Sequence, residues 1–539
     1  MYIEFLFGNE MIEPILVVSL RLQKYKMKRL YVILTTMLGL MYSLSAIAQV
    51  ELREEIQWTT SSEDHTPLWL NANKYGLSSL DKTNGYVRIG AFMPVERDEA
   101  RRWSWGYGAD VAVTEGFSSR FVVQQAYADV RWLKGVLTVG SKEQPMQLKN
   151  QLLSSGSQTF GINARPIPQV RLSLPESWQV PGLRGWLSLK GHIAYGMATD
   201  DGWQKDFSHD MTRRTEHTLY HSKAGYVKIG PGKINVEAGL EMATQFGGKT
   251  YNMEDAYGNK VIIKNKNNLS AFWHALIPGG TDPTDGSFVN TEGNHVGSWV
   301  MRLNIDQPTW DLGIYADQFF EDHSQMFHFS YNGYGQGTEK DVHKKSRYFL
   351  YDFKDWMLGV ELHLKETPWL QRIVLEYLYT KYQGGPVYHD HTANINEQIS
   401  GCDNYYNHNI FTGWQHWGQV MGNPLYRSPL YNDNGEIRVL NNRFFAWHLG
   451  LSGKVVKRLD YRLLATWQKG YGCYNYLLPD PAENVSMLAE AGYRFPENSI
   501  MKGCTLKGAF SFDSGKIYGD NVGVQLTLSH RGWLNIKNK

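Results

Sequence analysis

Apolar and polar side chains alternate with a period of two residues over most of this 539-residue chain, and this pattern limits the possible folds more than any other feature. In the segment 103–113 every second residue is Trp, Tyr, Ala or Val, and mostly small or polar residues separate them. The segments 234–242 and 356–364 repeat the pattern. Further copies begin at Leu187, Trp299, Leu312, Ile373, Phe445, Leu459, Val485 and Val522. Because a period of two places one set of side chains on one face of an extended strand, the sequence predicts an all-β protein.

The connections between these segments fall into two classes. Short polar joints, such as 133–135 and 231–233, are typical of hairpin turns. Other neighbouring segments are separated by much longer stretches, which cover 141–170, 200–215, 245–292, 321–350 and 383–440. Short turns at one end and long loops at the other are typical of transmembrane antiparallel β-barrels.

Strand length and aromatic placement favour such a barrel over a soluble β-sandwich or propeller, whose strands also alternate. Strands of about nine to eleven residues with a continuous apolar face match a crossing of the bilayer. Aromatic residues that would form interfacial girdles stand at the strand ends, at Trp103, Trp186, Trp299, Trp356, Phe495 and Trp533. At about 25–30 residues for each strand with its share of loop, the chain predicts roughly sixteen to twenty strands.

The N-terminal region predicts export. Two basic residues, Lys28 and Arg29, precede an apolar stretch, and Ala46-Ile47-Ala48 then forms a small-residue cleavage site. This order is that of a secretory signal peptide, whereas a transmembrane anchor would need a longer apolar run. The predicted parts are an upstream start assigned in error (1–26), a signal peptide (27–48) and an outer-membrane β-barrel (49–539).

Composition argues against several function classes. Residues 49–539 carry equal numbers of basic and acidic side chains, so we expect no nucleic-acid partner. The same region has no run of about eighteen apolar residues, which a membrane-spanning helix requires. Cys402, Cys473 and Cys504 have no C-x-x-C spacing, and the sequence leaves open whether two of them form a bridge.

The segment 403–424, DNYYNHNIFTGWQHWGQVMGNP, is the richest candidate for a binding site. Sugars present C–H faces that stack on aromatic rings, and hydroxyl groups that need amide or imidazole partners. The candidate polysaccharide-binding residues are Tyr405, Tyr406, Asn407, Trp414, Gln415, His416 and Trp417. The alternative is a long loop whose aromatic rings pack on one another and on the barrel rim.

Metal binding and catalysis have weaker support. His389-Asp390-His391 and the pair His408 and His416 lack further ligands at a suitable spacing, so we expect no metal and no other cofactor. Neighbouring residues of a strand point to opposite faces, so Glu321 and Asp322 cannot share a site if that stretch is extended. No G-x-S-x-G motif is present. Inward acids (Glu237, Glu241, Glu361, Glu376) are expected to pair with Arg302, Lys365, Arg372, Arg443 and Arg494 and to line or close the lumen. We therefore expect a protein that is not an enzyme.

Several segments, in their order along the chain, resemble the Wzi-type capsule assembly proteins, in particular the branch found in Bacteroides-like bacteria. They are Thr66–Asn73, Ser155-Gly156-Ser157, Asn163-Ala164-Arg165 with Pro168, Gly293–Ser298, Phe320-Glu321-Asp322, Glu376-Tyr377, Tyr405-Tyr406-Asn407, Gly413-Trp414, Gly422-Asn423-Pro424 and Asn441-Asn442-Arg443. The resemblance implies an outer-membrane barrel of eighteen strands that binds capsular polysaccharide at the cell surface. The family tends to have Ser-Gly after its Glu-Asp pair, whereas this chain has His323-Ser324-Gln325.

The sequence therefore predicts an outer-membrane, lectin-like barrel that binds capsular polysaccharide and anchors or organises the capsule. Its expected partners are this polysaccharide, outer-membrane lipid and other capsule-export components. Two alternatives stay open: a general or sugar-selective porin, and a barrel enzyme that acts on lipid or glycan. The chain's last alternating run begins at Val522 and a polar tail follows it, so the exact C-terminal strand is left open.

Overall fold

A computed structural model describes residues 50–95, 102–255, 257–278, 293–321, 326, 329–330, 347–348, 354–383, 388–389, 398–399 and 403–534. The predicted upstream segment and signal peptide, 1–48, lie outside these residues, as do Cys402 and most of the His389-Asp390-His391 motif. Residues 51–532 form one compact unit.

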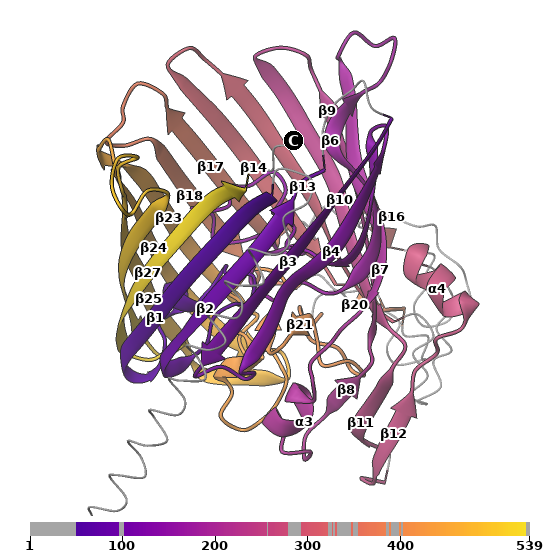
Figure 1. The fold of residues 1–539 in the computed structure, drawn as a ribbon. Coiled ribbons are helices and arrows are strands. Elements are labelled where there is room, and N and C mark those ends of the chain that lie inside the picture. Colours follow the sequence, from indigo (N-terminus) through magenta and orange to yellow (C-terminus); the bar gives the residue numbers. More distant parts are fainter. Residues whose placement is uncertain are drawn as a thin grey trace, which may run out of the picture. The chain divides into compact units, whose positions relative to one another are not determined.

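Eighteen antiparallel strands close into a barrel (Figure 1), as predicted. Each strand pairs with its neighbour along the chain, and the last strand returns to pair with the first. The strands are β1 (Val50–His65), β2 (Asp81–Met93), β3 (Trp103–Glu115), β4 (Phe121–Trp132), β5 (Gly135–Ser141), β6 (Gln169–Gln179), β7 (Leu187–Met197), β9 (Leu219–Ile229), β10 (Ile234–Phe246), β13 (Asn294–Asp306), β14 (Trp310–Phe320), β17 (Trp356–Leu364), β18 (Arg372–Tyr379), β23 (Phe444–Val456), β24 (Leu459–Cys473), β25 (Tyr476–Arg494), β26 (Cys504–Gly515) and β27 (Asn521–Leu534).

The alternation in sequence becomes an outer apolar face and an inner polar face. In β10, Ile234 and Val236 are exposed on the outside, whereas Glu237 and Glu241 point inward. Outer aromatic side chains stand at several strand ends, where Trp103, Trp186 and Trp533 are exposed. Every strand that the alternation predicted is present.

The two ends of the barrel differ in their connections. One end has short turns, such as 133–134 and 230–233. The other end carries the long connections, whose elements are α2 (Leu68–Asn71), α3 (Trp203–Phe207), β8 (Arg214–Glu216), β11 (Lys249–Glu254), β12 (Lys260–Lys264), α4 (Leu269–Leu276), β15 (Phe329–Ser330), β16 (Arg347–Tyr348), β19 (Tyr388–His389), β20 (Gln398–Ile399), β21 (Gln415–His416), β22 (Gln419–Val420) and η4 (Pro429–Tyr431). This division follows the sequence prediction. No helix in the described ranges is long and apolar enough to cross a membrane.

Three long connections, 66–80, 142–168 and 403–443, fold into the barrel and share one hydrophobic core with its inner wall. We call these segments the plug. Trp69 of the first segment donates its indole hydrogen to Thr466 Oγ1 on β24 (3.2 Å), and Leu153 O of the second accepts from His448 on β23 (2.8 Å). The plug therefore packs against inward-facing side chains of strands that are distant in sequence.

The inner ion pairs match the prediction in part. Glu361 binds both Arg302 and Arg372, at 2.9 Å each. Glu376 instead accepts hydrogen bonds from the plug and from Tyr315, and Glu241 accepts one from Tyr226. Lys365 pairs with Asp306 and Asp311, and Arg494 lies near Asp460. The prediction was wrong for Glu241 and Glu376 because they accept from hydroxyl and amide groups, which a charge count ignores. It was wrong for Lys365 and Arg494 because aspartates, which the prediction did not include, lie beside them.

Candidate functional site

Six of the seven residues predicted to bind polysaccharide are buried inside the plug. Tyr405, Tyr406, Asn407, Trp414, Gln415 and His416 each expose 6% of their surface or less. Trp417 is half-buried. The structure thus brings the seven residues into one region, and it gives most of them packing partners within the protein.

Tyr405 and Tyr406 connect the third plug segment to the barrel wall. Tyr405 Oη donates to Asp355 Oδ2 at 3.0 Å, and the amide of Tyr406 donates to Glu321 Oε2 at 3.0 Å. The ring of Phe319 meets both tyrosine rings edge-on, with centroids 4.8 and 5.2 Å apart. Burial among these partners raises the pKa of both phenols well above its usual value, so they stay protonated donors.

Trp414 and Asn407 are also satisfied within the protein. The Trp414 indole donates to Thr159 O at 3.0 Å, and its ring stacks on Tyr220 with centroids 6.0 Å apart. Asn407 exchanges two hydrogen bonds with the backbone of Val439. In this arrangement the faces of these rings are not open to a sugar, so direct stacking by Tyr405, Tyr406 or Trp414 stays a prediction.

Gln415, His416 and Trp417 line a small polar notch of about 20 Å³ together with residues of the 198–204 and 215–218 segments. His416 Nδ1 donates to Arg165 O (2.8 Å), and its Nε2 lies 3.2 Å from the amide of Thr199, which can donate to it. Burial lowers the pKa of His416 to about 4, although hydrogen bonds with the backbone of Arg165 and Thr199 act in the opposite direction. The imidazole is therefore neutral near pH 7, and Trp417 lies beside it with the Arg165 guanidinium 4.2 Å from its ring centroid.

Residues from the segments that resemble the Wzi family hold the plug together. Asn423 donates to Ser155 Oγ (3.1 Å) and to Gly156 O (2.9 Å), which joins the second and third plug segments. Asn73 of the first segment donates to Ser155 O at 2.9 Å. Glu376 on β18 accepts from the amide of Ser155 at 2.8 Å. The shared motifs therefore fix how the plug is seated in the barrel.

A buried ion pair fixes the second plug segment to the wall. Lys149 Nζ lies 2.8 Å from Asp317 Oδ2 on β14, and both side chains are almost fully buried. The same carboxylate accepts from the amide of Gln158 at 3.1 Å. A buried charge needs both a counter-charge and further hydrogen bonds, and Asp317 has both.

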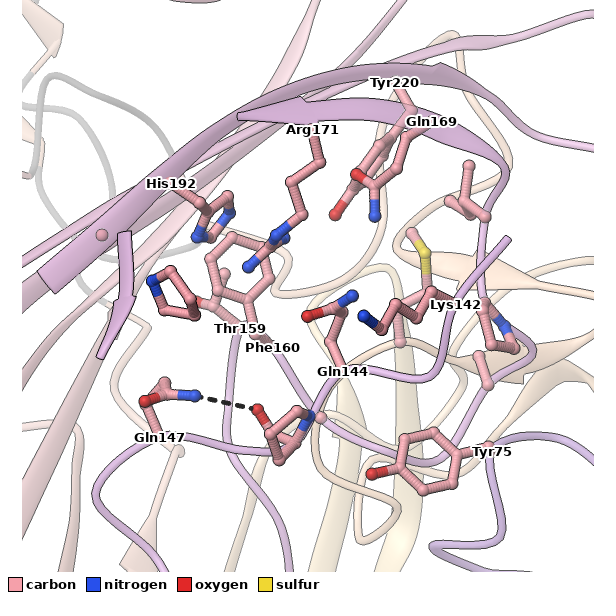
Figure 2. Close-up of a pocket in the computed structure, with 18 of the residues that line it drawn as sticks. Tyr75, Lys142, Gln144, Gln147, Thr159, Phe160, Gln169, Arg171, His192 and Tyr220 are labelled. Atoms are coloured by element: carbon pink, nitrogen blue, oxygen red, sulfur yellow. Dashed lines mark hydrogen bonds between the residues drawn. The ribbon is translucent and has the colours of Figure 1, made fainter. Parts of the chain in front are cut away.

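A cavity lies between the plug and the inner wall of β6, β7 and β9 (Figure 2). It has a volume of about 130 Å³. Its polar lining includes the side chains of Lys142, Gln144, Gln147, Thr159, Arg165, Gln169, Arg171, Lys190 and His192, and its aromatic lining those of Tyr75, Phe160, Tyr220, Tyr226 and Trp414. Lysine and arginine are present, whereas none of the described lining residues is Asp or Glu.

Arg171 stands apart from the other cations of this cavity. Lys142 lies 2.5 Å from Asp129, Lys190 lies 3.5 Å from Glu237, and Arg165 packs on Trp417. The Arg171 guanidinium makes no hydrogen bond or ion pair with any side chain in the described ranges. It extends from β6 toward Phe160 and Thr159 of the plug (Figure 2).

Sequence reasoning missed Arg171. The sequence signal was the alternation itself, since apolar Val170 and Leu172 stand on either side of Arg171. In the structure both are exposed on the outer face, so Arg171 points inward. The strand itself went unrecognised because Pro175 and Glu176 interrupt its alternation.

No cluster of three metal-binding side chains occurs among the described residues, where His408 instead accepts from the amides of Ile410 and Phe411. Cys473 and Cys504 are free thiols.

Comparison with known proteins agrees with the barrel. The family model described as capsule assembly protein Wzi matches residues 59–347. Among solved structures, the chain is similar to the Escherichia coli outer-membrane protein Wzi, a carbohydrate-binding β-barrel involved in group 1 capsule assembly. That match has a TM-score of 0.52 at 14% identity and covers 88% of this chain and 83% of the other.

Other barrels are more distant. Pseudomonas aeruginosa OccD3 matches with a TM-score of 0.44 at 9% identity, over 91% of this chain and 92% of its own. Acinetobacter baumannii OccAB2 matches with a TM-score of 0.44 at 8% identity, over 90% and 98%. Comparison with curated protein sequences gives no match. The family model covers more than half of the chain, and the structure is an outer-membrane β-barrel, so this chain belongs to the Wzi family of capsule assembly proteins.

Proposed function

We propose that this protein binds capsular polysaccharide and holds the capsule at the cell surface. Long loops of outer-membrane barrels face the cell exterior, so the plug and the notch lie toward the capsule. The supporting relative is E. coli Wzi, which is a carbohydrate-binding barrel. Export by the signal peptide 27–48, membership of the Bacteroides-like branch and contact with other capsule-export components belong to the same proposal.

The observation that carries the proposal is the plug. An open porin needs a free passage, whereas here three long connections occupy the lumen and share a core with its wall. Because these connections are fixed in the lumen, their outward-facing side chains, which include Trp417, keep one arrangement. A fixed surface loses less conformational entropy when it binds a long polymer, and many copies on one cell bind the polymer together.

A clean deletion tests this function. Cells that lack the protein should keep normal capsule synthesis but shed most of the polysaccharide into the medium, which is measured as cell-bound against released polymer. Expression of the wild-type chain should restore retention. An unchanged ratio of bound to released polymer in the deletion strain would contradict the proposal.

A further inference from the structure

The Arg171 cavity carries an inference about ligand chemistry, which rests on the proposed function. A guanidinium that is taken out of bulk water without a counter-charge loses solvation free energy, and proteins usually compensate it with an anion. The other three cations of the cavity have partners, as described above. Arg165 has no side-chain acceptor either, but it donates to Gly76 O at 3.4 Å. Arg171 is the one whose five N–H donors have neither a side-chain nor a backbone acceptor among the described residues.

The surroundings of Arg171 suit a sugar more than a bare ion. The ring of Phe160 lies beside His192, with centroids 5.5 Å apart, and offers an apolar face next to the cation. Gln144 and Gln169 carry amides that can donate hydrogen bonds to hydroxyl groups and accept hydrogen bonds from them (Figure 2). Lys190 also lines a second cavity, together with Glu237 and Arg302.

We infer that this cavity binds an acidic sugar residue, whose carboxylate pairs with Arg171 while its ring lies against Phe160. A planar guanidinium can bind a carboxylate through two parallel hydrogen bonds, which a neutral sugar cannot offer.

The test is calorimetric titration of the purified full-length protein with sodium glucuronate, glucose and inorganic phosphate. The wild type should bind glucuronate measurably and glucose at least tenfold more weakly. Arg171→Gln should weaken glucuronate binding at least tenfold, and Arg171→Lys should weaken it less. The matched control is Arg184→Gln, in the exposed turn between β6 and β7, which should bind like the wild type.

Equal binding of glucuronate by the wild type and Arg171→Gln, or equal binding of glucose and glucuronate by the wild type, would overturn the inference. Binding of phosphate without glucuronate would overturn the sugar assignment. Heat-dependent gel mobility confirms that each variant is folded. Because capsule retention is measured separately in the deletion strain, this inference can fail while the proposed function stands.

A second inference comes from α4, which covers part of the outer wall of the barrel. Met242, Thr244 and Phe246 point outward like Ile234 and Val236 of the same strand, yet each exposes 3% of its surface or less. Ala271 and Ala275 of α4 pack with Phe246 in one apolar cluster. Figure 1 shows α4 beside the strand wall rather than within the barrel.

Polar side chains of the outer wall meet the backbone of α4. Tyr195 Oη donates to Phe272 O (2.8 Å), Lys223 Nζ to Ala275 O (3.1 Å), and His295 Nε2 lies 3.2 Å from His274 O. The contacts of Lys223 and His295 satisfy carbonyls in the last turn of the helix, which have no partner within it. They also shield polar groups that would otherwise face lipid, where an unsatisfied group is costly.

The opposite face of α4 is apolar and exposed. Leu269, Trp273 and Ile277 follow one another at a spacing of four residues and expose 88%, 57% and 50% of their surface. Side chains at this spacing form one stripe along a helix.

The height of α4 identifies what contacts this stripe. The apolar band of an outer-membrane barrel is about 25 Å tall, and a tilted strand crosses it in about nine to eleven residues. Counted from Ile234 at the short-turn end of β10, the band ends near Met242–Thr244. The contacts of α4 with β10 are at Thr244 and Phe246, next to this edge of the band. We propose that α4 lies in the outer leaflet, with Leu269, Trp273 and Ile277 among the acyl chains.

Spin labels test this placement in the full-length protein reconstituted in lipid vesicles. With the three native cysteines replaced by Ser, labels at Leu269→Cys and Ile277→Cys should be accessible to oxygen and shielded from a water-soluble nickel complex. Tyr257→Cys is the matched control in the same connection, because Tyr257 is 90% exposed and lies before β12, and its label should be reached by the nickel complex. Labels at Leu269 and Tyr257 with the same accessibility to nickel would overturn the placement.

Discussion

Two buried histidines make the plug sensitive to acid. Burial lowers the pKa of His408 to about 3 and that of His416 to about 4, from an ordinary value of 6.5. Between these folded-state pKa values and pH 6.5, the unfolded chain therefore binds more protons than the folded chain. The stability that the neutral rings contribute is lost as the pH falls through this window.

We expect the plug to open more readily at pH 4.5 than at pH 7.5. At about 1.4 kcal/mol per pH unit, complete protonation of His416 alone would cost on the order of 3 kcal/mol. Amide hydrogen exchange in the segment 403–424 measures this free energy. The variant His416→Gln should show a flatter pH dependence, and an unchanged slope in this variant would contradict the role of His416.

Trp414 and Trp417 should respond differently to replacement by alanine. Trp414 is fully buried, so Trp414→Ala should destabilise the plug by about 3–5 kcal/mol and speed hydrogen exchange around it. Trp417 is half-buried, so Trp417→Ala should change plug stability by no more than about 1 kcal/mol and reduce capsule retention. A folded Trp417→Ala protein with wild-type retention would remove this residue from the binding surface.

At the level of elements, the ion pair between Lys149 and Asp317 should keep the second plug segment in the lumen. Lys149→Met leaves a buried carboxylate without its counter-charge, which typically costs about 3–5 kcal/mol. We expect the wild type to conduct little or no current in planar bilayers and this variant to show channel openings. Lys502→Met, at an exposed lysine, is the control and should stay silent. Large, steady wild-type currents would instead support the porin alternative.

The alternation of side chains predicted the elements of the barrel far better than those of the plug. It identified β10, β17 and β24 because one face of each strand is continuously apolar. It missed β1, whose outer and inner faces both carry charged residues, and β6, which a proline interrupts. The resemblance to a known family supplied the strand number.

The plug lay beyond such reasoning because its buried residues look like surface residues. Ser155 and Asn423 are polar, and they are buried because each binds backbone or side chains of another segment. Contacts of this kind join residues that are far apart in sequence and leave no periodic pattern. The seven candidate residues were therefore placed correctly in one region, but the burial of six of them was not foreseen.

At the level of the whole molecule, closure of the barrel depends on β27. This strand pairs with β26 and with β1, so its loss leaves two open strand edges. A chain truncated before Asn521 should fail to reach the outer membrane and should lack the faster-migrating unheated form on gels. Removal of residues 535–539 alone is the control and should preserve both properties. Normal assembly of the longer truncation would contradict this role of β27.

The pairing of β1 with β27 also has a consequence for assembly in the cell. The first strand is made and exported first, but its partner is the last segment of the chain to arrive. Until then β1 has an unpaired edge that can join other chains, and contacts between distant segments form slowly. We therefore expect assembly to need chaperones and insertion machinery that protect this edge for as long as the barrel is open.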